Sequence, residues 1–144
     1  MSDSAPGAAI GRARLRREAR ERALELSYER EQRGDDLADL LASLTLPPEP
    51  YTERLLSAVD SAVDDIDALI ADRLRGWTIE RLPVLDLLVL RLAIAELRVT
   101  DTPTGVVLAE AVDLASRYGT DESSKFVNGV LAAIVKDMER PGGA

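Results

Sequence analysis

Six arginines lie close together near the start of this 144-residue sequence, and together they could bind a polyanion. They are Arg12, Arg14, Arg16, Arg17, Arg20 and Arg22. Only two glutamates accompany them between Gly11 and Arg22, whereas residues 34–144 carry ten basic and twenty acidic side chains. A guanidinium keeps its charge, forks onto phosphate oxygens and stacks on unpaired bases. The sequence therefore predicts polyanion binding by a basic arm, although the formal net charge of the whole chain is −8.

The spacing of apolar residues around these arginines predicts a helix over about residues 14–33, ending before Gly34. The apolar positions recur at intervals of three or four residues, at Leu15, Ala19, Ala23 and Leu26. Arg16 and Arg20 are four residues apart, so we expect them on one face of this helix. Three of the five aromatic residues could each either stack on a base or pack in the core, namely Tyr28, Tyr118 and Phe126.

Enzymatic and metal chemistry find little support in the residue types. The absence of histidine and cysteine excludes histidine-based catalytic triads, thiolate metal sites and disulfides. Glu110 and Asp113 could be a general acid and base, but no other reactive group converges on them. Five aspartates are better explained as the solvated face of one helix, namely Asp60, Asp64, Asp65, Asp67 and Asp72. We therefore predict no catalytic residue, no metal site and no cofactor.

The elements that must position these side chains are all predicted to be helices. No segment alternates polar and apolar residues with the period of two that is typical of strands. Helical spacing and end signals mark segments at about residues 14–33, 35–44, 51–75, 83–99, 103–118 and 121–138. Asp35 or Asp36, and later Asp101, are the predicted helix caps, and Pro47–Pro50 is a rigid connector. Gly129 interrupts the last helix, where we expect another group to approach closely. The predicted fold class is all-α with six or seven helices.

A single domain is expected over residues 11–140, between a disordered leader at 1–10 and a flexible tail at 141–144. The most apolar stretch, Val84 to Ala95, includes Asp86 and Arg91 and is too short to span a bilayer. The first 25 residues lack the apolar core of a secretory signal. Together with the absence of cysteine, this favours a location in the cytoplasm.

Three blocks of the sequence together resemble the NusB family. The first block is Ala19–Ala23 followed by Tyr28. The second comprises Trp77–Leu82, Leu90–Ala93 and Glu96–Leu97. The third and most specific comprises Glu110–Ala115, Tyr118–Gly119 and Lys125–Leu131, which contains the string FVNGVL. In order and spacing the resemblance covers about residues 14–135.

This resemblance implies an all-α bacterial transcription antitermination factor, built from two packed helical subdomains, that is not an enzyme. Members of the family pair with NusE, a small-subunit ribosomal protein. The pair binds the boxA element of ribosomal RNA leaders, so that elongating RNA polymerase passes terminators. Carried over by position, the resemblance implies RNA contacts at Arg16, Arg17, Arg20, Tyr28, Lys125 and Phe126. It also implies that Glu80 and Asp86 form an acidic docking surface for NusE.

Three positions depart from the family pattern. Leu87 stands where a basic residue is common, Ala109 where an asparagine is common, and Ser27 where an aliphatic residue is usual. Two alternatives also remain open. A NusB-like domain occurs in front of RNA methyltransferase domains, but 144 residues leave no room for a catalytic domain. The chain could instead be a helical protein-binding adaptor, or a homodimer that buries the arginine helix.

Overall fold

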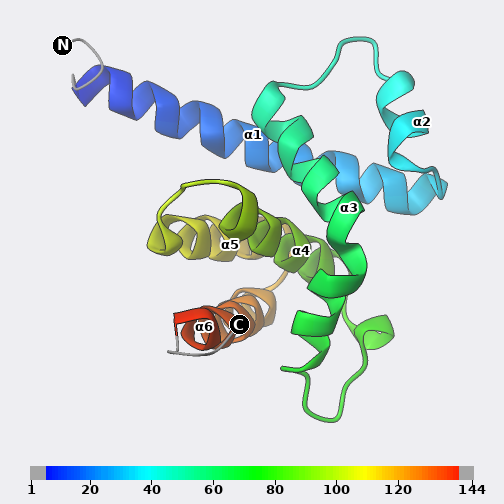
Figure 1. The fold of residues 1–144 in the computed structure, drawn as a ribbon, viewed down its shortest axis with the longest axis vertical. Helices are drawn as coiled ribbons and strands as arrows, with labels where there is room; N and C mark the ends of the chain where they lie inside the picture. Colours follow the sequence, from blue (N-terminus) through cyan, green and yellow to red (C-terminus); the bar gives the residue numbers. More distant parts are fainter. Residues whose placement is uncertain (1–5, 140–144) are drawn as a thin grey trace.

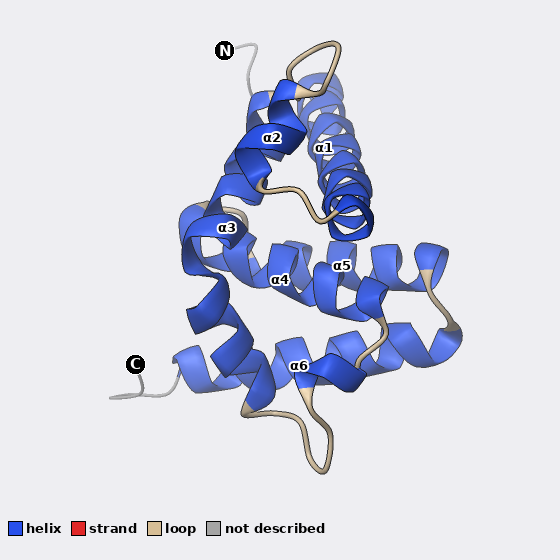
Figure 2. Ribbon diagram, turned by 90° about the vertical axis from the view of Figure 1, so that its right-hand side faces the viewer, coloured by secondary structure: helices blue, strands red, loops and turns tan. Residues whose placement is uncertain are grey.

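The computed structural model describes residues 6–139 of the chain, and every regular element in that range is helical (Figure 2). The elements are α1 (Pro6–Arg33), α2 (Leu37–Ala42), α3 (Pro50–Ala71), the 3₁₀ turn η2 (Ile79–Arg81), α4 (Val84–Val99), α5 (Thr104–Tyr118) and α6 (Asp121–Glu139). The predicted all-α fold class is confirmed. None of the described helices is long and apolar enough to cross a membrane.

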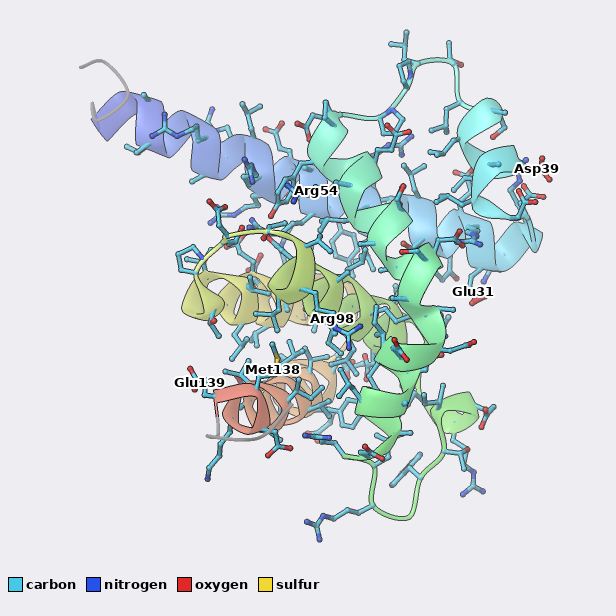
Figure 3. All side chains as sticks on the ribbon, viewed as in Figure 1. Glu31, Asp39, Arg54, Arg98, Met138 and Glu139 are labelled. Carbon is cyan, nitrogen blue, oxygen red and sulfur yellow. The ribbon has the colours of Figure 1, made fainter. Side chains whose placement is uncertain are left out.

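Helix α4 is the centre of the molecule and packs against α1, α3, α5 and α6 (Figures 1 and 2). Ten of its sixteen residues are buried, which agrees with its nearly continuous apolar sequence. In Figure 2, α1 and α2 lie above α4 and α5, α6 lies below them, and α3 runs along one side of the bundle from α1 to α6; side chains fill the space between the helices (Figure 3). Arg54 of α3, labelled in Figure 3, donates a hydrogen bond to the carbonyl of Val99 at the end of α4. The buried apolar residues form one continuous core.

Helix α1 begins earlier than the sequence predicted. Residues 6–10, expected to belong to a disordered leader, form its first turns, and Pro6 is compatible with a first turn because the missing N–H would have no partner there. This end extends past the other helices (Figure 1), and Ile10 and Leu15 are 63% and 59% exposed. Residues 1–5 and the expected tail at 141–144 lie outside the described residues. The helix ends as predicted, at Gly34, whose φ of +71° favours glycine.

The next two helices follow the local sequence signals at their starts. Asp36 caps α2, where its carboxylate accepts a hydrogen bond from the N–H of Asp39 at 2.8 Å. Pro50 stands at the first position of α3, with the Glu49 side chain accepting from the N–H of Tyr51. Helix α3 ends at Ala71, before the predicted stop. The predicted stop itself, Gly76, has a φ of +75° and turns the segment that leads to η2.

The cap of α5 differs from the predicted one, and α6 starts with a reciprocal cap. Asp101 does not cap α5; Pro103 occupies the N-cap position without a side-chain hydrogen bond. Before α6, Thr120 and Ser123 form a reciprocal cap. The N–H of Ser123 donates to Oγ1 of Thr120, and the N–H of Thr120 donates to Oγ of Ser123, both at 3.2 Å. This reciprocal pair of hydrogen bonds, between residues three apart, fixes where α6 starts.

Two glycines of this region should respond oppositely to alanine. A Cβ atom at Gly129 would meet nothing within 4 Å, so the close approach expected there is absent. Gly129→Ala should raise the free energy of unfolding by about 0.5–1 kcal/mol, because glycine is a poor helix former. At Gly119 a Cβ would lie 2.7 Å from Oγ of Ser123 and 2.8 Å from the carbonyl of Ala115. Gly119→Ala should therefore lower the free energy of unfolding. Urea unfolding of both variants measures the two changes, and equal effects would contradict the prediction.

Candidate nucleic-acid interface

The exposed arginines of α1 border an open hollow of about 670 Å³. Arg16 and Arg17 line it from α1, and Thr102, Pro103 and Glu110 line it from the α4–α5 connection and α5. Helical geometry explains the pairing, since adjacent helix residues project about 100° apart and both can reach one side. Arg20 lines the hollow as well but is buried, so the hollow presents two accessible cationic side chains at one edge of an acidic molecule.

Each of these two arginines makes one contact that orients its guanidinium group, but both side chains remain accessible. The guanidinium carbon of Arg16 lies 4.0 Å from the centroid of the Tyr51 ring, a cation–π contact. Arg17 donates from Nε and Nη2 to the two carboxylate oxygens of Glu110, at 3.1 and 3.2 Å. These hydrogen bonds and the charge of Glu110 raise the pKa of Arg17 above its ordinary value. The Arg17 side chain is nevertheless 56% exposed, so it can reach a ligand in the hollow.

Arg20 lies on the same side of α1 as Arg16, as expected, and lines the same hollow, but unlike Arg16 and Arg17 it is not accessible. It is only 6% exposed, and its Nε and Nη2 donate to the buried carboxylate of Glu96 at 2.9 and 2.7 Å. Burial by itself would lower the pKa of Arg20, but the hydrogen bonds and charge of Glu96 outweigh it and the pKa is raised. The N–H donors of its guanidinium are engaged by carboxylates, so Arg20 is unavailable for a direct phosphate contact in this conformation.

A buried polar network extends from Arg20 and fastens α1 to the rest of the bundle. The hydroxyl of Tyr51 donates to Glu96 at 2.5 Å and lies 3.0 Å from Oγ1 of Thr102. Nearby, Oγ1 of Thr52 donates to the backbone carbonyl of Ala19 at 2.9 Å. Sequence reasoning did not assign Tyr51 or Glu96 this role. The signal available was a glutamate in a helix that is apolar nearly all round, where a carboxylate requires a buried partner.

The remaining predicted RNA residues lie in two places. Tyr28 is 40% exposed and lies on nearly the same face of α1 as Arg17, about 16 Å farther along the helix axis. Lys125 is exposed and Phe126 half-buried, and both belong to α6, which α4 and α5 separate from α1 (Figure 2). The structure therefore brings Arg16 and Arg17 together but leaves the α6 residues on a second surface.

Arg117 and Tyr118, at the end of α5, stand between these two surfaces. Arg117 donates to Asp113 at 2.8 Å and to Glu21 of α1 at 3.3 Å, so this end of α5 touches the arginine helix. The same contacts raise the pKa of Arg117 against the lowering effect of burial. Its guanidinium lies 5.5 Å from the ring centroid of Tyr118, which is 38% exposed. The sequence prediction included Tyr118 only as one open alternative and did not consider Arg117.

The predicted acidic docking pair is also divided by the fold. Glu80 is exposed in η2, as expected. Asp86 is only 5% exposed, in the first turn of α4, where a carboxylate is favoured by the helix dipole. It lies in a small hollow whose lining includes Trp77 and Phe126. Asp86 is buried whereas Glu80 is exposed, so the two carboxylates do not form one exposed surface.

Most of the other carboxylates considered from the sequence are engaged in ion pairs. Glu110 binds Arg17, and Asp113 binds Arg117, so both members of the possible acid–base pair are held by arginine. The aspartate face of α3 is solvated only in part. Asp60 pairs with Arg30 and Asp67 pairs with Arg91, at 2.7 and 2.8 Å. Among residues 6–139, no group of three or more carboxylates is arranged to hold a metal ion.

The positions that depart from the family pattern have different surroundings. Leu87 is buried at 8% exposure and contributes to the core. Ala109 lines the hollow beside Arg16 and Arg17, and Ser27 lines a separate hollow between α1 and α3. The apolar residue at 87 is therefore a packing feature, whereas Ala109 borders the cationic surface.

Comparison with known proteins decides the family. A model of the NusB family matches residues 17–136, most of the chain. The chain belongs to the NusB family. The transcription antitermination protein NusB of Acidothermus cellulolyticus is 46% identical to it, over 83% of this chain and 86% of that protein. NusB of Thermobifida fusca is 40% identical, over 84% and 89%.

Solved NusB structures share the fold. NusB of T. maritima superposes with a TM-score of 0.76 at 36% identity, covering 85% of this chain and 91% of that one. A structure of the antitermination factors NusB and NusE in complex with dsRNA has a TM-score of 0.72 at 31% identity, covering 85% and 97%. Both solved relatives match over nearly their whole length. The family match at residues 17–136 includes parts of both α1 and α6.

Proposed function

We propose that this chain is a transcription antitermination factor that binds boxA-type leader RNA together with the ribosomal protein NusE, and that it acts on elongating RNA polymerase only indirectly. The observation that carries the proposal is the pair of exposed guanidinium groups, on Arg16 and Arg17, at one hollow of an otherwise acidic molecule. The names of the relatives and the solved complex of NusB and NusE with RNA support it. The role is one of binding, without a catalytic step.

The RNA path in this proposal begins at α1 and reaches α6. Arg16 and Arg17 neutralise phosphates, and Tyr28 and Phe126 offer rings on which unpaired bases can stack. A strand that touches both α1 and Lys125 passes Arg117 and Tyr118, because these lie where α5 meets α1 and leads into α6. Arg20 acts through its ion pairs with Glu96 and Glu110, by holding α1 in place.

Binding of the full chain to RNA across a salt series tests the proposed function. Single-stranded RNA carrying boxA should bind more weakly as salt rises, because each phosphate contact releases counterions. NusE should increase the affinity, and a duplex of the same length serves as the comparison ligand. An affinity that is undetectable both with and without NusE would contradict the proposal.

A homodimer without RNA binding is the second candidate, and one observation favours it. Ile10 and Leu15 are large apolar side chains that α1 leaves 63% and 59% exposed. A second copy could cover them. Sedimentation equilibrium distinguishes the candidates, because an apolar dimer interface resists salt and would persist while RNA fails to bind.

Charge reversal at Glu80 should weaken NusE binding. Glu80→Lys places a cation where a basic partner is expected to dock, and we expect the affinity to fall about ten-fold or more with little change in the melting temperature. Asp86 is excluded from this test because reversing a buried carboxylate would disturb folding. Asp64→Lys, at an exposed position on α3, is the matched control. Equal affinities for Glu80→Lys and the control, measured by calorimetry, would place the docking surface elsewhere.

A further inference from the structure

A separate hollow of about 520 Å³ lies between the C-terminal end of α3 and helix α6. Arg75, from the segment that follows α3, lines it together with Lys125 and Phe126 of α6. Two of these residues were already expected to contact RNA, whereas Arg75 was not considered. The hollow therefore joins an additional arginine to the predicted α6 surface.

Three basic side chains line this hollow, and two of them, Arg75 and Lys125, are not neutralised by its acidic ones. Asp137 forms an ion pair with Arg73, and Asp72 lies 3.9 Å from the same guanidinium. Both acids of the lining are thus engaged by Arg73, which is itself only 16% exposed. Lys125 has only a distant contact with Glu122, 3.9 Å away, and both side chains are largely exposed.

Arg75 differs from most arginines of this chain because it has no partner within residues 6–139. Among the described residues it makes no ion pair or hydrogen bond, whereas Arg30, Arg91 and Arg117 are each paired with an aspartate. It is exposed and precedes Gly76, whose positive φ turns the chain sharply at this point. A free guanidinium on a tight turn is available to a phosphate without first breaking an ion pair.

The α6 side of the hollow is open at Gly129. Gly129 lines it, and a Cβ atom there would meet nothing within 4 Å. The half-buried ring of Phe126 lies three residues earlier on α6, so the two positions are neighbours on the helix surface. Open space beside an aromatic ring, bordered by two cations, matches the needs of a nucleotide: a surface for the base and charge for the phosphate.

We propose that this hollow binds one nucleotide of the RNA, with Arg75 and Lys125 neutralising its phosphates and Phe126 stacking against its base. The inference rests on the proposed function, since it takes RNA as the ligand. It extends the RNA path beyond α6 to the turn between α3 and η2. It also assigns Arg75 a binding role that charge clustering near the N-terminus does not reveal.

The test compares three variants of the full chain, with fluorescence anisotropy of a boxA-bearing single-stranded RNA across a salt series. Arg75→Ala should flatten the slope of log affinity against log salt by about 0.7, which is about a five-fold loss at 0.1 M salt. Arg75→Lys should restore the slope because the charge returns. Arg81→Ala is the matched control, since Arg81 is exposed on the same connection but outside the hollow.

An Arg75→Ala line that overlaps the wild-type line, or that coincides with Arg81→Ala, would overturn the inference. So would an unchanged RNA affinity accompanied by weaker NusE binding, which would make the hollow a protein surface. Arg16→Ala with Arg17→Ala in the same series separates this failure from failure of the proposed function. If that double variant loses affinity while Arg75→Ala does not, the RNA function stands and only the nucleotide position is wrong.

Discussion

Replacing Glu96 by glutamine is expected to lower the free energy of unfolding by about 3–5 kcal/mol, the largest stability effect we predict for a single side chain. Glu96 is 2% exposed and accepts hydrogen bonds from Arg20 and Tyr51. Glutamine keeps the volume but removes the negative charge, so the buried guanidinium of Arg20 loses its main partner and keeps only the longer contact with Glu110, at 3.5 Å. Urea unfolding followed by circular dichroism measures the change.

A double variant shows whether the stability lost in Glu96→Gln comes from the charge of Arg20 left without its main partner. Arg20→Met with Glu96→Leu removes both charges and leaves apolar side chains of similar size, so most of the lost stability should return. The hydroxyl of Tyr51 keeps Thr102 as a partner. A loss below about 1 kcal/mol for Glu96→Gln would mean that water reaches the pair. In that case the network would not fasten α1, and the arginine surface would be held by apolar packing alone.

Removing the guanidinium groups of Arg16 and Arg17 together is expected to produce the largest loss of RNA binding. Two phosphate contacts of about 0.7 each should flatten the salt slope by about 1.4, which is about a 25-fold loss of affinity at 0.1 M salt. Folding should change little, because both side chains are exposed and Glu110 keeps its contact with Arg20. Anisotropy titrations with NusE present provide the measurement.

Arg22→Ala is the matched control for this double variant. Arg22 is exposed on the same helix but projects about 140° around the axis from Arg17, and it pairs with Glu25. Its removal should leave the RNA salt slope nearly unchanged. If Arg22→Ala and the double variant weaken binding in proportion to the charges removed, the RNA responds to overall charge and the hollow beside α1 has no special part in binding.

The helices and their ends follow from local signals that the sequence displays directly. Gly34 stops α1, Asp36 caps α2 and Pro50 opens α3, because each acts on backbone groups within a few residues. The all-α class likewise follows from apolar spacing, which is a property of neighbouring residues. Even so, local signals misplace some boundaries. Helix α1 extends back to Pro6, and α3 ends at Ala71, before the glycine that marks the turn.

The sequence by itself also established the charge distribution and the motifs that point to the NusB family, but only the tertiary structure decided which charged residues are available. Arg16 and Arg20 are equivalent by helical spacing, yet Arg16 is exposed and Arg20 is buried. The difference is made by Glu96 and Glu110, which are 76 and 90 residues away from Arg20 along the chain. The burial of Asp86, and the meeting of Arg75 and Lys125 at one hollow, likewise depend on packing between residues that are far apart in the sequence. Helix periodicity determines which side chains share a face, whereas the burial of those side chains depends on the residues that another helix packs against that face.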